Sequence, residues 1–143
     1  MRSAWNSKPR CATYPDLAYA LEGYGLAESR VGHDQDAVRQ LRAALSFTAE
    51  DDLTHDFRVV NLAAQLMKLG QNDEALKLLN EEIATAPEYP RSWSNRAVIR
   101  YGRGEVASAM GDAQTALRLD PTNAQARSLL VMLKASDPVA PQR

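Results

Sequence analysis

Residues 70–87, GQNDEALKLLNEEIATAP, are followed 34 positions later by residues 104–121, GEVASAMGDAQTALRLDP. Both stretches begin with glycine, carry alanine at the sixth place and end with proline. A fixed period of this length is typical of stacked helix–turn–helix repeats. Each such repeat has an apolar face too small to form a core alone, so neighbouring repeats must pack on one another.

An earlier and less regular copy lies 38 positions before the first of these stretches. Gly32 and Ala37 there correspond to Gly70 and Ala75. The four additional residues fall in the segment 49–55, which is the boundary between two copies and has no proline. The sequence therefore predicts three copies of one unit.

Seven helices are expected from the apolar periodicity and the turn residues. Glycine ends the first helix of each pair because it tolerates the left-handed conformation. Proline closes the longer turns between pairs because it lacks the N–H that would continue a helix. The expected helices cover residues 16–30, 34–48, 53–69, 72–86, 90–103, 106–119 and 123–135.

Length and composition predict one domain of 143 residues with its own apolar core. The chain has 17 Lys and Arg residues against 18 Asp and Glu residues, for a net charge of −1. Because binding to a phosphate backbone needs an excess of basic residues, nucleic acid is not an expected partner. No apolar run approaches the ~20 residues that span a bilayer, so membrane insertion is not expected. Residues 1–15 and 136–143 are expected to be tails, and the first fourteen residues lack the apolar core of a signal peptide. Cys11 is the only cysteine, which fits a reducing, cytoplasmic location.

The pattern resembles the tetratricopeptide repeat (TPR) family over residues 18–123, with a further helix at 124–135. In that family, small residues occupy the eighth, twentieth and twenty-seventh places of a 34-residue repeat, where the two helices touch. The resemblance sets the repeats at 18–51, 56–89 and 90–123. The corresponding places hold Gly25, Ala37, Ala44, Ala63, Ala75, Glu82, Ala97, Ala109 and Ala116.

The resemblance implies an all-α fold, a right-handed α-solenoid of three helix–turn–helix repeats plus a C-terminal helix, with residues 16–135 as the repeat domain. The sequence departs from the family pattern at four places. Glu82 occupies a place that is normally alanine, and Glu28 occupies one that is usually aromatic. Arg96 and Arg100 occupy inward places that are often leucine and tyrosine.

In such a solenoid the first helix of each repeat lines an inner groove, and the resemblance implies that a partner segment binds there. Asn61 and Asn95 occupy equivalent groove places, and an amide side chain both donates and accepts hydrogen bonds. We expect this pair to hold the backbone of an extended peptide; the alternative is that both amides only bind water on an exposed helix. In the first repeat the groove places are Tyr19, Glu22, Gly23, Leu26, Ser29 and Arg30. The predicted groove residues of the other two repeats are Phe57, Val60, Asn61, Ala64, Met67, Lys68, Arg91, Ser94, Asn95, Val98 and Tyr101.

One specialised ligand of the family, the C-terminal carboxylate of a chaperone, is not expected here. Family members that bind it use lysine, asparagine and arginine side chains from three successive repeats. In either possible register most of those places hold uncharged residues, and in one register Glu22 has the wrong sign. A desolvated carboxylate needs positive, hydrogen-bonding partners.

No metal or cofactor site is expected. His33 lies close to Asp34 and Asp36, but aspartates at the start of a helix are ordinary caps and dipole partners. The acidic run 50–52 near His55 is expected to be a solvated loop.

No catalytic site is expected either, so the chain is not predicted to be an enzyme. Gly23 and Gly25 superficially suggest a phosphate-binding loop, but they lie inside a helix rather than after a strand. Cys11 has no neighbouring histidine to activate it.

Three arginines, Arg96, Arg100 and Arg103, are spaced to lie along one helix face. We expect them to be solvated or paired with acids of a neighbouring helix such as Asp112. The alternative is an acidic ligand.

The final helix contains Leu129, Leu130 and Leu133 and reads as apolar on every side. A helix of this kind is normally buried, so these leucines are a possible interface with a second copy or a larger complex. The leading prediction is a non-catalytic adaptor that binds a partner segment in the groove. The alternatives are a structural assembly module and a small TPR chaperone for secreted proteins.

Overall fold

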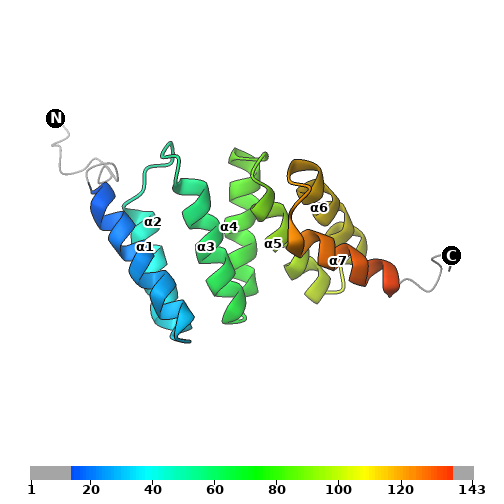
Figure 1. Ribbon diagram of the computed structural model, residues 1–143, viewed down its shortest axis with the longest axis horizontal. Helices are drawn as coiled ribbons and strands as arrows, with labels where there is room; N and C mark the ends of the chain where they lie inside the picture. Colours follow the sequence, from blue (N-terminus) through cyan, green and yellow to red (C-terminus); the bar gives the residue numbers. More distant parts are fainter. Residues whose placement is uncertain (1–13, 137–143) are drawn as a thin grey trace. The chain divides into compact units, whose positions relative to one another are not determined.

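The computed structural model describes residues 14–136, and all regular structure in this range is helical (Figure 1). The helices agree with those expected from the sequence to within two residues at each end. Cys11 and most of the two expected tails, residues 1–13 and 137–143, lie outside the described residues. Over residues 14–136, no helix is long and apolar enough to cross a lipid bilayer. The helices are α1 (Pro15–Arg30), α2 (Asp34–Ser46), α3 (His55–Lys68), α4 (Asn72–Thr85), α5 (Pro90–Gly102), α6 (Val106–Leu119) and α7 (Ala124–Ala135).

These helices form two compact units that divide between Gln71 and Asn72. In the first unit α1 packs against α2, and α2 packs against α3. In the second unit α4 packs against α5, and both α5 and α7 pack against α6. The expectation that residues 16–135 form one repeat domain stays a prediction.

Glycine ends the first helix of each pair, as the sequence predicts. Gly32, Gly70 and Gly104 have φ values of 86°, 74° and 79°, the left-handed region that favours glycine. After α1, the His33 N–H donates to the carbonyl of Glu28 at 2.9 Å, which is the closing bond of a Schellman motif. The same bond closes the helices before the other two glycines, so all three turns use one mechanism.

The predicted small residues are the points at which helices approach closely. All nine of those places are buried, including the one occupied by Glu82. A Cβ atom on Gly25 would lie 3.0 Å from Cγ of Leu41 and 3.2 Å from the carbonyl oxygen of Ala37. Glycine therefore lets α1 lie directly on α2, and the predicted burial of the nine contact places is observed.

The last helix, α7, is buried on one side only. Leu129 and Leu133 belong to the core of their own unit, where they pack with alanines of α5 and α6. These two leucines, predicted for an interface, are therefore core residues. Leu130 is half-buried, whereas Val131 and Met132 are exposed.

We predict that Ala109→Leu destabilises the second unit by about 1–3 kcal/mol, because Ala109 is fully buried and a larger side chain would force the helices apart. The midpoint of urea denaturation measures the effect. Ala107→Leu is the matched control, since Ala107 is exposed on the same helix. Equal midpoints for the two variants would contradict the close packing at Ala109.

Candidate partner-binding site

In the first unit, the first helices of two repeats are joined side by side by polar contacts. Near the middle of α1, Glu22 accepts hydrogen bonds from Arg58 and Asn61 of α3, at 3.3 Å and 3.4 Å. Near the C-terminal end of α1, Ser29 donates to Gln65 of α3 at 2.9 Å. The inward places of α1 and α3 therefore belong to one continuous face.

The charge of Glu22 is neutralised within this face. Both Glu22 and Arg58 are buried, and the Arg58 Nε and Glu22 Oε2 atoms are 3.3 Å apart. Arg58 also donates to the hydroxyls of Thr48 at 2.9 Å and Thr54 at 2.7 Å. The sequence predicts Glu22 as a groove residue with the wrong sign for a carboxylate ligand, but it does not predict the pairing with Arg58, which is 36 residues away.

The predicted groove residues of α3 divide into a buried and an accessible set. Val60 and Asn61 are buried, and the whole Asn61 residue is only 7% exposed. Phe57 and Lys68 are exposed. The remaining two, Ala64 and Met67, are half-buried.

On α5 in the second unit the same division appears. Ser94 and Asn95 are buried, with Asn95 only 5% exposed, while Val98 is half-buried. Arg91 and Tyr101, near the two ends of the helix, are exposed. Ser94 is tied to the start of α7, because its hydroxyl accepts a hydrogen bond from the Asn123 amide at 3.3 Å.

The two predicted clamp amides are therefore not exposed side chains. Asn61 donates to Glu22 within its own unit, and Asn95 Nδ2 is buried without a hydrogen-bond acceptor among residues 14–136. The alternative, that both amides bind water on an exposed helix, is wrong for the same reason. Equivalent repeat places carry the same residue here, but burial keeps both amides from direct contact with a partner.

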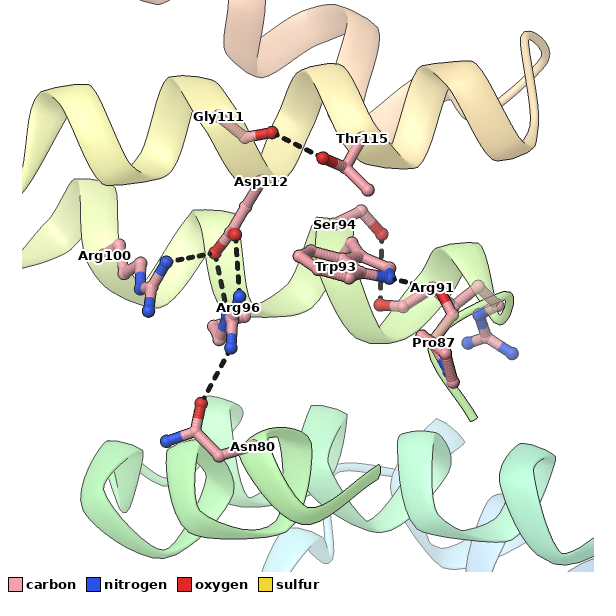
Figure 2. Close-up of polar contacts among 10 residues, drawn as sticks. All are labelled: Asn80, Pro87, Arg91, Trp93, Ser94, Arg96, Arg100, Gly111, Asp112 and Thr115. Carbon is pink, nitrogen blue, oxygen red and sulfur yellow. Dashed lines mark hydrogen bonds and ion pairs between the residues drawn. The ribbon is translucent and has the colours of Figure 1, made fainter. Parts of the chain in front are cut away.

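A second charge cluster, centred on the buried Asp112, lies between α5 and α6 (Figure 2). Asp112 accepts two hydrogen bonds from Arg96 and one from Arg100, each 2.9 Å long. Arg96 also donates to Asn80 of α4 at 3.0 Å, and its guanidinium carbon lies 5.0 Å from the centroid of the Trp93 ring. The predicted pairing with Asp112 is thus confirmed for two of the three arginines.

The third arginine, Arg103, donates to Asp73 of α4 at the surface. Trp93, which packs under Arg96, donates its indole N–H to the carbonyl of Pro87 at 2.8 Å (Figure 2). The three arginines thus all have partners within their own unit, which leaves the alternative of an acidic ligand without support.

The acidic loop before α3 is ordered by its own hydrogen bonds. Asp52 accepts from the backbone N–H of Thr54 at 2.7 Å and from its hydroxyl at 2.5 Å. These bonds favour the ionised carboxylate and hold the pKa of Asp52 below its usual value. Leu53, between them, is fully exposed.

The side chain of His33 pairs with Glu28, which precedes it in the sequence. Its Nδ1 atom is 2.7 Å from Glu28 Oε2, and the potential ligand atoms of Glu28, His33 and Asp36 lie within 4.8 Å of one another. A hydrogen bond to Glu28 and the negative charge of that carboxylate raise the pKa of Tyr24. Asp36 is also paired with Arg39 at 3.3 Å, so side-chain pairing accounts for this cluster.

We predict that Asp112→Ala destabilises the second unit by roughly 3 kcal/mol, because it leaves two mostly buried arginines without their partner. The Asp112 side chain is 5% exposed. Urea denaturation followed by circular dichroism measures the change. The control is Asp73→Ala: the Asp73 side chain is 97% exposed, so loss of its ion pair should leave the midpoint unchanged. A similar effect of both substitutions would contradict the assigned difference in burial.

Two curated relatives match part of the chain. Protein FlbA of Caulobacter vibrioides is 24% identical over 104 residues, which cover 73% of this chain and 17% of that protein. A TPR repeat-containing protein of Rhizobium etli is 35% identical over 51 residues, which cover 36% of this chain and 25% of that protein. The chain therefore spans a quarter or less of the length of these relatives.

A solved structure, the first TPR domain of Spaghetti (RPAP3) bound to the HSP90 peptide SRMEEVD, has a similar fold. The TM-score is 0.73 at 20% sequence identity, and the match covers 85% of this chain and 93% of that one. The family model for the tetratrico peptide repeat matches residues 18–92, which is more than half of the sequence. The chain belongs to the tetratricopeptide repeat family.

Proposed function

We propose that this chain is a non-catalytic interaction module that binds a segment of a partner protein on the exposed face of its first helices. Membership of the TPR family supports the proposal, because these repeats generally serve protein–protein interaction. The similar domain of Spaghetti holds a peptide of HSP90. For the present chain, the partner segment has to match the side chains that its own helices expose.

The observation that carries the proposal is the composition of the α1–α3 face. Tyr19 and Phe57 occupy the same place in successive repeats, and both rings are exposed. Between their helices, the charge of Glu22 is already neutralised by Arg58. Exposed aromatic rings supply much of the binding energy at protein interfaces, so this face favours an apolar contact.

In the second unit the accessible residues of the α5 face are Arg91, Val98 and Tyr101. We propose the same role for this face by itself. The buried Asn61 and Asn95 then support the binding faces of their units instead of touching the partner. The cytoplasmic location expected from the sequence stays a prediction.

We predict that peptides selected from a random-peptide phage library on the immobilised full chain bind to the α1–α3 face. The double substitution Tyr19→Ala/Phe57→Ala should weaken the selected peptides at least tenfold, because truncating aromatic anchors removes apolar contact area. Fluorescence anisotropy with labelled peptides measures the dissociation constants.

The matched control is Val131→Ala, which shortens an exposed apolar side chain on α7 and should leave the affinity unchanged. If the library yields no binders, or if the double variant binds them as tightly as the wild type does, the proposed function is wrong.

A second candidate function is assembly through α7, and the exposed side chains of Val131 and Met132 favour it. A charge placed there should separate associated chains, because it cannot be buried without a partner. Light scattering over a dilution series should show a concentration-dependent mass for the wild type and a monomer for Val131→Glu. Two identical monomers would contradict assembly through this helix.

A further inference from the structure

Gly23 occupies the repeat place that holds Asn61 and Asn95 in the other two repeats. Both asparagines are buried, whereas Gly23 is exposed in the interior of α1. The sixth place of the repeat is therefore open to a partner only in the first repeat, and there it carries no side chain.

The fold itself does not require glycine at this position. A Cβ atom on Gly23 would meet no other atom within 4 Å, and its φ is not in the left-handed region. Gly25, two residues later, is different, because a Cβ atom there would lie 3.0 Å from Leu41. A helix with glycine in its interior is less stable than the same helix with alanine. Gly23 therefore destabilises α1, and no close contact in the structure requires it there.

The nearest side chains to Gly23 along α1 offer a partner no unpaired charge. Tyr19 lies one helical turn earlier on the same face and is 74% exposed. Leu26 lies about one turn later and is half-buried. Glu22, the adjacent acid, is paired with Arg58 at 3.3 Å. A partner charge placed here would lose water without gaining a counter-charge, which disfavours a charged segment.

We propose that Gly23 is a contact point at which an uncharged, extended partner segment lays its main chain against α1, with an apolar side chain against the ring of Tyr19. A bare Cα lets another backbone approach a helix more closely than any side chain allows. The inference rests on the proposed function and deepens it, because it names the position and the chemistry of the segment.

The test separates stability from binding. Gly23→Ala should raise the urea midpoint, because alanine favours the helix and meets no neighbour. The same substitution should weaken, about tenfold, the selected peptides that lose affinity on Tyr19→Ala. Gly23→Gln, which projects a longer neutral side chain, should weaken them further and leave the fold intact.

Gly111→Ala is the matched control. Gly111 also lies inside a helix with open space around its Cα, so this substitution should raise the midpoint and leave peptide affinity unchanged. Gly25→Ala should lower the midpoint, because its methyl group would be crowded against α2.

Wild-type affinity in both Gly23 variants would overturn the inference while leaving peptide binding itself in place. A lower midpoint for Gly23→Ala would also overturn it, because the space would then not be open. A library without binders would instead contradict the proposed function. An aspartate scan of each selected peptide adds an independent readout: a peptide that keeps its affinity with aspartate at every position would contradict the uncharged contact.

Discussion

The structure depends on helices that touch without large side chains between them. At Gly25 the α1 backbone is so close to α2 that even a methyl group would be crowded against Leu41. Alanine has the same role at Ala37 and Ala109, which are both fully buried. When helices approach this closely, many backbone and Cβ atoms come into contact, and the larger residues beside them fill the remaining space at high density. Small residues at fixed intervals therefore determine where each helix lies.

This constraint also explains why so much of the fold could be predicted. Small residues, turn glycines and closing prolines act on their own few neighbours, and the repeat shows each of them more than once. The helix boundaries, the left-handed glycines and the buried contact places all follow from such local signals. The position of Glu82 shows how strong the register is, because this carboxylate is buried at a place where the family has alanine.

The contacts that shape the candidate site were harder to predict, because they join residues far apart in the chain. Glu22 and Arg58 are 36 residues apart, and no local pattern connects them. The sequence predicts Asp112 as a partner of the arginines because it expects acids on a neighbouring helix, but no local pattern predicts the two hydrogen bonds that Arg96 donates to it. For Asn61 and Asn95 the prediction of equivalent repeat places is correct, but the predicted contact with a partner is wrong because both side chains are buried. Equivalence in the repeat does not determine whether a side chain is exposed.

The buried ion pair in the first unit also affects what this face can recognise. A well-packed apolar pair could join α1 and α3 with similar or greater stability, because burying two charges costs much of what their attraction returns. Unlike an apolar contact, the hydrogen bonds from Arg58 and Asn61 to Glu22 are directional, so they define the orientation of α1 relative to α3. A face fixed in this way loses little conformational freedom when a partner binds. Because the charge of Glu22 is already paired with Arg58, the part of the face beside Tyr19 distinguishes partners by shape and apolar contact, and the open backbone at Gly23 is a place where its shape differs from that of the other two repeats.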